Sequence, residues 1–297
     1  MAKGVLFAAS AFVLWGMFPL YFKALAAVPP LEVLAHRVVW SLVFVALVLA
    51  LRRQWGWLKA LRRQPRVVAL FSLSATLLAV NWCIYIWAVA SDRVVDASLG
   101  YFINPLVNVL LGLVLLKESL RPGQWLAVLT AAAGVAWLTW HSGQFPWIAI
   151  TLAITFGFYG LLRKTGALGP LEGLALESIV LAPVGLLWLA WLSSAGTAVF
   201  PTLPAGTQWL LAASGPITAI PLLLFAAGAR RIPLSVLGLL QYVGPTLQLL
   251  LGVWLYHEPF GQERLIGFAL IWLALAIYSA EGALRAWWNR PVPVSEL

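Results

Sequence analysis

Long apolar runs alternate with short polar stretches along the whole chain. Ten of the runs hold roughly 18–25 residues each, which is long enough to cross the hydrocarbon core of a bilayer as a helix. They occupy residues 4–25, 31–52, 66–90, 94–116, 122–140, 145–163, 171–193, 207–229, 232–256 and 263–285. The pattern therefore predicts an all-α membrane protein with ten transmembrane helices.

Composition supports the membrane assignment and excludes several classes of function. The 297 residues are 62% hydrophobic and only 10% charged, which is too apolar for an ordinary soluble globule. One cysteine excludes an internal disulfide, and no GxxxxGK[ST] motif for binding nucleotide phosphates occurs. The histidines, His36, His141 and His257, are far apart and lie near predicted helix ends. We expect no metal, no cofactor, no nucleic-acid partner and no catalytic residues.

The positive charge, +9 overall, is distributed unevenly between the predicted loops. If the N-terminus is cytoplasmic, 15 of the 19 Lys and Arg residues fall in cytoplasmic segments. Because cytoplasmic loops are enriched in Lys and Arg, both termini are predicted to lie in the cytoplasm, with residues 286–297 as a tail. The chain is then a multi-pass protein of the inner (cytoplasmic) membrane.

An internal repeat relates the two halves of the sequence. Shifting the chain by 140 residues aligns 104–118 with 244–258, and six of these 15 positions are identical. Residues 31–37 match 171–177 at the same shift. Each unit, 4–140 and 145–285, would hold five helices, and an odd number inverts the second unit in the membrane. Inverted repeats are typical of secondary transporters that work by alternating access.

A resemblance to a known family is carried by four stretches: "LWGMFPLYFK", "NWCIYIWAVAS", "SLGYFINPLVNVLLGLVLLKE" and "LGLLQYVGPTLQLLLGVWLYHE". They resemble RarD-type permeases, which are EamA-like members of the drug/metabolite transporter superfamily, and the resemblance covers nearly the whole chain. It implies an inner-membrane carrier with a central cavity formed mainly by predicted helices 1–4 and 6–9, and with helices 5 and 10 at the periphery. It implies no particular substrate.

Two polar stripes mark corresponding helices of the two repeats. Tyr101, Asn104 and Asn108 share one helix face, and Gln241 and Gln248 are repeat mates of the first and last of them. Because hydrogen-bonding groups are costly against lipid, we predict that the stripes line a central cavity. The alternative is that the amides join neighbouring helices by hydrogen bonds.

Pro105 and Pro245 are repeat mates within these stripes. A proline cannot donate a backbone hydrogen bond to the carbonyl one turn earlier, so it kinks a helix. The pair is predicted either to act as hinges or to give two curved helices their shape.

Arg37 and Glu177 are the most suggestive charges, because they are repeat mates of opposite sign inside predicted membrane helices. An embedded charge indicates a functional site. The pair would bind the two ends of a zwitterion, or Glu177 would carry a coupling proton. The alternative for Arg37 is an interfacial ion pair with Glu32, Asp92 or Asp96.

Further candidates are polar and aromatic residues on other helices. Asn81 and Tyr85, four residues apart, place hydrogen-bonding groups on one helix face. Trp82, next to Asn81, would form an aromatic wall beside them, and Trp15, Tyr159 and Tyr242 would extend that wall. The alternative is that these aromatic residues only pack between helices.

These features favour a secondary transporter that moves a small amphipathic metabolite or drug-like molecule by alternating access. Efflux, with or without proton coupling, is the predicted direction, and the alternative is an uptake permease for an amino acid or a vitamin-like solute. An intramembrane enzyme or a scaffold is disfavoured by the absence of catalytic constellations and by the embedded polar groups. The expected partners are a small-molecule substrate and the bilayer, and the sequence does not specify an oligomeric state.

Overall fold

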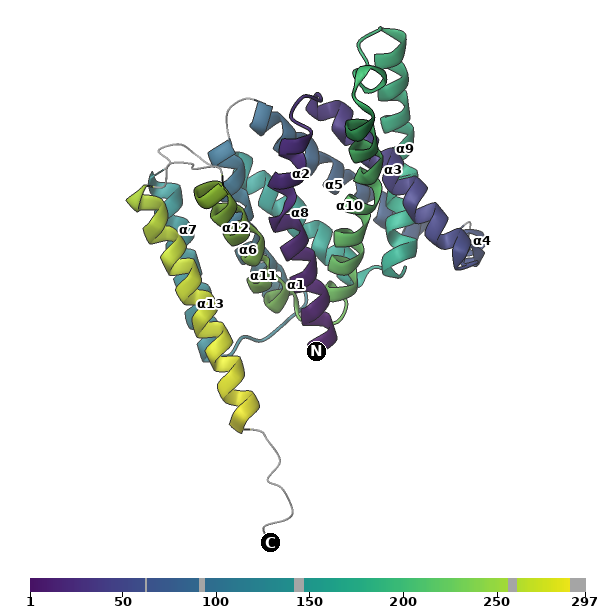
Figure 1. Cartoon of the computed structure of the whole chain (residues 1–297). Coiled ribbons are helices and arrows are strands. Elements are labelled where there is room, and N and C mark those ends of the chain that lie inside the picture. The colour runs from purple at the N-terminus through teal and green to yellow at the C-terminus, as the bar shows by residue number, and fades with distance from the viewer. Residues whose placement is uncertain (62, 91–93, 142–146, 256–260, 289–297) are drawn as a thin grey trace, which may run out of the picture.

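The computed structural model describes the chain except for residues 62, 91–93, 142–146, 256–260 and 289–297 (Figure 1). The described residues form helices and their connections, and no strand occurs among them. The helices are α1 (Ala2–Gly16), α2 (Phe18–Ala24), α3 (Pro30–Leu51), α4 (Gly56–Leu61), α5 (Pro65–Ala90), α6 (Val94–Val114), α7 (Pro122–His141), α8 (Trp147–Thr165), α9 (Pro170–Ser194), α10 (Ala205–Ala229), α11 (Leu234–Gln241), α12 (Val243–Leu250) and α13 (Gln262–Trp288). Shorter turns are a 3₁₀ helix at Phe200–Thr202 and a π-helical turn at Leu251–Leu255.

Within the described residues, each predicted apolar run consists largely of helical chain. Among the described residues, six helical segments are long and apolar enough to cross a membrane, and Gly100–Val114 and Leu265–Glu281 are two shorter apolar helices. A backbone that meets all its hydrogen bonds within the helix is what a bilayer requires. The chain is therefore an all-α, multi-pass membrane protein.

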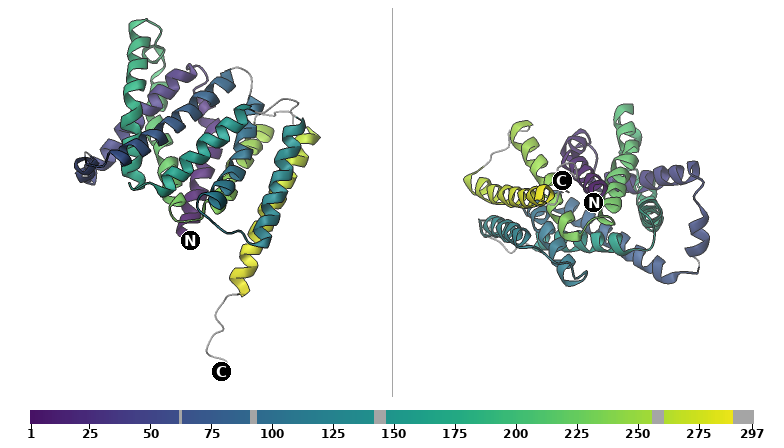
Figure 2. Two further views of the ribbon diagram at one scale, coloured as in Figure 1. Left: turned by 180° about the vertical axis from the view of Figure 1, so that it is seen from behind. Right: turned by 90° about the horizontal axis from the view of Figure 1, so that it is seen from below.

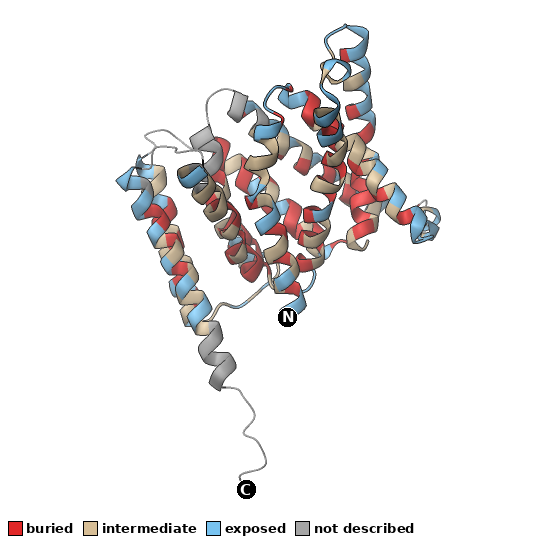
Figure 3. Cartoon of the chain, in the orientation of Figure 1, coloured by how far each residue is buried: buried red, intermediate tan, exposed pale blue. Residues whose placement is uncertain are grey.

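Large apolar side chains lie on the surface as well as in the core, and several polar side chains are buried; Figure 3 shows the burial of each described residue along the chain. Large apolar residues lie on the outside, where Trp209 is 75% exposed and Leu187 is 71% exposed. Polar residues are found inside, where Asn108 and Glu177 are buried. Lipid would cover the outer surface, so the interior is where polar groups can find partners.

The first predicted transmembrane helix is broken at Met17, between α1 and α2. Pro19 causes the break, because it has no N–H to donate to the Trp15 carbonyl one turn earlier. The Gln248 side chain, from α12, donates to that carbonyl at 3.1 Å. An amide from the second half of the chain thus supplies a hydrogen bond that the first half cannot make.

The two prolines of the repeat have different surroundings. Pro105 lies inside α6, which continues from Val94 to Val114. Pro245 is the third residue of α12 and follows the break at Tyr242 that separates α11 from α12. Whether either proline acts as a hinge stays a prediction.

The helices are arranged with α7 and α13 side by side on one flank (Figures 1 and 2). On the other flank α3 packs against α9 and α10, and α1, α6, α8, α11 and α12 lie between the two flanks. Small residues allow close crossings: a Cβ added at Gly16 would lie 2.7 Å from the Leu247 side chain, and one at Gly157 would lie 2.7 Å from Val107. Such small-residue contacts are typical of helix packing in membranes.

Candidate functional site

The predicted polar stripes meet where α6 packs against α11. Asn108 Nδ2 donates to Gln241 Oε1 at 2.8 Å and to Asn104 Oδ1 at 3.2 Å. All three side chains are buried, and Asn108 Oδ1 has no partner among the described residues. The two predicted stripes therefore join in one buried amide network. Its hydrogen bonds between α6 and α11 agree with amides that join helices, and its unpaired Asn108 Oδ1 agrees with amides that line a cavity.

Tyr242, between α11 and α12, and Gln248, on α12, donate hydrogen bonds to backbone carbonyl groups of other helices. The Tyr242 hydroxyl donates to the Phe102 carbonyl at 3.2 Å, and Gln248 donates to the Trp15 carbonyl as described above. Tyr242 is fully buried, whereas Tyr101 is only partly buried. In this conformation the Tyr242 hydroxyl hydrogen-bonds to α6, and the Gln248 amide joins α12 to α1.

Trp15 and Tyr159 belong to one aromatic cluster with Phe156 and Phe225. The ring centroid of Trp15 lies 5.7 Å from Phe156 and 5.6 Å from Phe225, and Tyr159 stacks on Phe225 at 5.9 Å. Tyr159 is fully buried and its hydroxyl has no partner in the described part of the chain. Of the residues predicted to form an aromatic wall, Trp15 and Tyr159 thus share one cluster, Tyr242 is not part of it, and the Tyr159 hydroxyl is unpaired among the described residues.

Asn81 and Tyr85 make separate contacts on α5. Asn81 Nδ2 donates to the Leu152 carbonyl and to Thr155 Oγ1, both at 2.9 Å, and so ties α5 to α8. The Tyr85 ring instead faces Tyr101 of α6 with centroids 5.7 Å apart. Tyr85 and Tyr101 therefore form an aromatic pair across the gap between α5 and α6.

Arg37 of α3 lies among aromatic rings and a hydroxyl group. Its guanidinium carbon is 4.9 Å from the Trp82 ring centroid, 5.3 Å from Phe22 and 5.8 Å from Phe18. Arg37 Nε donates to Thr218 Oγ1 of α10 at 3.0 Å. Arg37 is 8% exposed, and no described carboxylate lies within ion-pair distance of it.

The acidic residues proposed as partners for Arg37 are accounted for in part. Glu32 accepts hydrogen bonds from the backbone N–H groups of Val199, at 3.1 Å, and Phe200, at 2.9 Å. Its carboxylate thus caps the 3₁₀ helix at Phe200–Thr202. Asp92 and the Asp96 side chain lie outside the described residues.

Glu177 of α9 has a different set of neighbours. Ser74 Oγ donates to Glu177 Oε1 at 2.6 Å, and Arg163 Nη1 lies 3.6 Å from the same oxygen. The side chains of Arg163 and Glu177 are 2% and 1% exposed. Arg163 Nη2 donates to the Pro170 carbonyl at 2.8 Å, and its guanidinium carbon lies 5.6 Å from the Phe71 ring. The charges of Arg163 and Glu177 compensate each other inside the protein.

Arg163 and Thr218 were not identified as site residues from the sequence. Arg163 precedes Lys164 at a predicted helix end, where a cationic pair is expected on topological grounds alone. The repeat gives a signal for the neighbourhood of Thr218 and none for Arg163: at the shift that relates Arg37 to Glu177, Ser214 corresponds to Ser74. Ser74 bonds to Glu177, and Ser214 lies one turn before Thr218 on α10.

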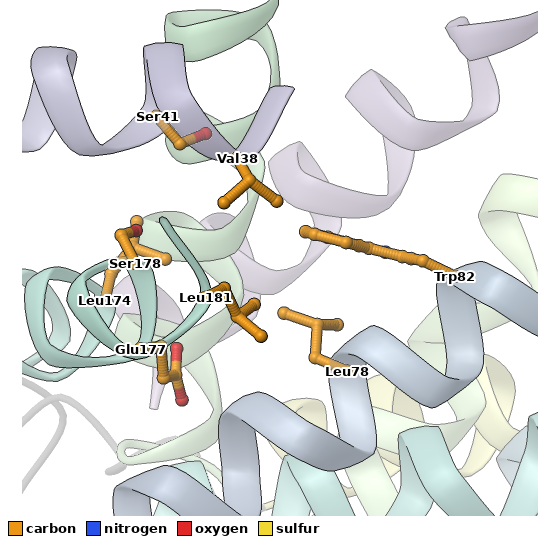
Figure 4. Close-up of a pocket in the computed structure, with 8 residues that line it drawn as sticks. All are labelled: Val38, Ser41, Leu78, Trp82, Leu174, Glu177, Ser178 and Leu181. Atoms are coloured by element: carbon orange, nitrogen blue, oxygen red, sulfur yellow. The ribbon is translucent and has the colours of Figure 1, made fainter. Parts of the chain in front are cut away.

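A small cavity of about 20 Å³ lies between α3, α5 and α9 (Figure 4). Trp82 reaches toward it from α5, and Glu177 lies on the α9 side together with Leu181. The cavity therefore lies between the Trp82 ring, which contacts Arg37, and Glu177. In this conformation the two predicted repeat mates are not brought together as a pair.

A larger apolar hollow of about 340 Å³ lies farther along the same three helices. Cys83, Trp87 and Trp188 are among the residues that line it. Among the described residues, no group of three His, Cys, Asp or Glu side chains could hold a metal ion. The imidazole of His36 instead lies against the Phe200 ring, with ring centroids 4.7 Å apart and the planes tilted by 32°.

Comparison with known proteins finds relatives over nearly the whole chain. The family model described as "EamA-like transporter family" matches residues 2–140. An "Uncharacterized transporter" of Pseudomonas aeruginosa is 45% identical over 99% of this chain and 98% of its own. "Protein RarD" of Escherichia coli is 44% identical over 93% of each chain. A crystal structure of a protein that is 22% identical matches 92% of this chain and 96% of that chain with a TM-score of 0.68, which shows a shared fold.

Proposed function

This chain belongs to the EamA-like transporter family as a RarD-type membrane transporter, and from that premise we propose how it works. It is a secondary transporter that carries a small amphipathic molecule across the cytoplasmic membrane by alternating access. Residues 4–140 and 145–285 form two inverted units of five transmembrane helices, with both termini in the cytoplasm. Export is its working direction.

The packing of the helices supports an inverted repeat. The crossing of α6 with α8 has its counterpart in the crossing of α11 and α12 with α1, and α3 with α10 has its counterpart in α9 with α5. Gly16 at Leu247 and Gly157 at Val107 are corresponding close approaches in the first of these pairs. In addition, α1 begins and α13 ends at the same end of the bundle (Figure 1). Two units related in this way can rock about their shared interface.

The observation that carries the proposal is the amide network of Asn104, Asn108 and Gln241. It lies at the interface of the two units, it is buried in an otherwise apolar bundle, and it leaves Asn108 Oδ1 without a described partner. A plain structural bond would satisfy its groups, whereas a transport pathway needs polar groups that can change partners.

Glu177 supports proton coupling within the same proposal. Its carboxylate has partners on both α5 and α8, and Glu177 Oε2 has no described partner. A change in its protonation would alter contacts to two neighbouring helices at once. Undiminished proton-driven flux through Glu177→Gln would remove Glu177 as an obligatory carrier.

Counterflow in proteoliposomes tests the transport proposal. The purified protein would be screened with labelled aromatic amino acids, aryl carboxylates and lipophilic cations. For a solute that the wild type exchanges, Asn108→Leu is expected to lower the counterflow rate at least about tenfold, because it removes both of that side chain's hydrogen bonds. Thr130→Val is the matched control, because Thr130 Oγ1 bonds only locally to the Leu126 carbonyl on α7. Equal rates in wild type and Asn108→Leu would exclude the network from the pathway.

Membrane orientation and direction need a separate experiment. With Cys83→Ser as background, single cysteines at Arg53 and at Gly206 should react with an impermeant maleimide from the cytoplasmic and the external side respectively. Accumulation of the exchanged solute in everted vesicles would support export, and accumulation in right-side-out vesicles would support uptake.

A further inference from the structure

The interior contains two buried arginines with different electrostatic surroundings. Arg163 is accompanied by Glu177, with Arg163 Nη1 and Glu177 Oε1 3.6 Å apart. Arg37 has no carboxylate within ion-pair distance among the described residues, and the carboxylate of Glu32 is occupied by backbone N–H groups. A buried charge without a partner is costly in a membrane protein. The positive charge of Arg37 is therefore left without a counter-ion among the described residues.

The groups around Arg37 are suited to a planar organic anion. A guanidinium binds a carboxylate through two parallel N–H donors, and only Nε–H of Arg37 has a hydrogen-bond partner in the described part of the chain. The rings of Trp82 and Phe22 lie against the guanidinium and present apolar faces. Trp82 also lines the cavity between α3, α5 and α9 (Figure 4).

A second observation points to a missing ligand at the same place. Ser214 is fully buried, and its hydroxyl has no hydrogen-bond partner among the described residues. It lies one helical turn before Thr218 on the same face of α10. The Tyr21 hydroxyl, which donates to the Leu210 carbonyl at 3.1 Å, lies near Ser214 and Arg37 but forms no hydrogen bond of normal geometry to Ser214. Its repeat mate, Ser74, donates to the carboxylate of Glu177 at 2.6 Å. At the corresponding position near Arg37, the structure has a hydroxyl donor but no described carboxylate.

We propose that Arg37 and Ser214 bind the carboxylate of the transported molecule, and that the substrates are amphipathic organic anions with a planar apolar body. This inference rests on the proposed transport function and replaces the zwitterion as the substrate class. Glu177 cannot serve as a free site for an amine while Arg163 neutralises it, so the net charge available to a substrate is positive. Trp82 and Phe22 would flank the planar body.

Binding measurements with matched ligand pairs test the proposal. Calorimetry on the purified protein in nanodiscs of zwitterionic lipid would compare aryl carboxylates with the corresponding neutral carboxamides. The wild type is expected to prefer the carboxylate at least about tenfold, because charge-assisted hydrogen bonds exceed neutral ones. Arg37→Gln should abolish this preference, Arg37→Lys should retain part of it, and Ser214→Ala should reduce it less than Arg37→Gln does.

Arg231→Gln is the matched control, because Arg231 also lies against an aromatic ring, Phe7, at 5.3 Å but is exposed. It should leave the carboxylate preference unchanged. If Arg37→Gln does not fold, as judged by size-exclusion chromatography, Arg37→Lys and Ser214→Ala carry the test. A wild type that binds carboxylate and carboxamide equally would overturn the proposal.

Other sources of the anion give different outcomes. If Arg37 is paired with Asp92 or Asp96, Arg37→Gln will leave carboxylate affinity unchanged, which contradicts the proposal. If a lipid phosphate occupies the site, Arg37→Gln will change retention of phosphatidylglycerol over phosphatidylcholine and not the ligand preference, which also contradicts it. Carboxylate binding without counterflow would refute the transport function and keep the site. Counterflow of neutral solutes that is insensitive to Arg37→Gln would keep transport and refute the site.

Discussion

The Arg163 and Arg37 regions are built on corresponding helices but treat a buried charge in opposite ways. In the first, α9 contributes Glu177, α5 contributes Ser74, and the arginine comes from α8. In the second, α3 contributes the arginine itself, α10 contributes Thr218, and α2 contributes an aromatic ring. In the Arg163 region the buried charges compensate each other, whereas in the Arg37 region no described anion compensates the arginine. The sequence repeat thus pairs Arg37 with Glu177, but of the two only Glu177 has an oppositely charged neighbour among the described residues.

The largest effect is expected from removing the charge of Arg163. Arg163→Gln leaves the Glu177 carboxylate buried without its cation, which should destabilise the protein by about 3–5 kcal/mol. Unfolding in SDS titrations, followed by tryptophan fluorescence, would measure it. Glu281→Gln is the control, because Glu281 and Arg121 form a 3.1 Å ion pair whose side chains are 24% and 36% exposed. A control loss below about 1 kcal/mol is expected.

A double variant should recover part of that loss. Arg163→Gln combined with Glu177→Gln leaves two neutral amides, so no buried charge remains uncompensated. The stability loss of the double variant should be smaller than the sum of the single losses by about 1–3 kcal/mol. Strict additivity in the same SDS titrations would show that the two side chains do not act as a pair.

A smaller effect is expected from filling the space that Arg163 occupies. A Cβ at Gly173 would collide with Arg163 Nη1 and Phe71, so Gly173→Ala should cost about 1–3 kcal/mol through overpacking. The corresponding position near Arg37 is Val33, which already carries a branched side chain. Val33→Ala removes buried apolar atoms without disturbing an arginine, so its stability loss serves as a comparison for apolar packing alone. Wild-type stability in Gly173→Ala would mean that Arg163 can move without penalty.

The smallest effect on stability is expected at Arg37. Arg37→Gln removes the hydrogen bond to Thr218 and the ring contacts, but it also removes an uncompensated buried charge. These contributions oppose each other, so the free energy of unfolding should change by less than about 1 kcal/mol. A loss comparable to that of Arg163→Gln would show that Arg37 has an anionic partner within the protein, and the comparison would fail.

The helical segments could be predicted from the sequence because each apolar run has the length of the hydrocarbon core. The break at Met17 was missed, since apolar periodicity continues through it although Pro19 lies close by. A kink was expected at Pro245, and α12 begins there after a break at Tyr242. The repeat shift located Arg37 and Glu177 as mates. It could not show that Arg163 lies beside Glu177, because these residues are 14 apart in sequence on two different helices, α8 and α9, and meet only in the folded chain.

The surroundings of Arg37 were predictable only in part. Trp82 stands next to Asn81, which hydrogen-bonding chemistry singles out, but Phe22 and Thr218 are ordinary residues of apolar helices. Thr218 approaches Arg37 through the crossing of α3 with α10, and Phe22 approaches it from α2. Local sequence encodes neither arrangement. Charge and repeat patterns thus identify residues, while tertiary packing decides which of them remain unsatisfied.

The hydrogen bond from Gln248 to the Trp15 carbonyl makes any separation of α12 from α1 depend on whether water can reach that carbonyl. Pro19 cannot supply the missing donor in any conformation, since the limitation is covalent. If α12 withdraws from α1, as the proposed alternating access requires, water or another polar group must take the place of the Gln248 amide. Wetting of this point between the two halves of the chain is therefore a physical condition for their separation, and a dry interface there would hold them closed.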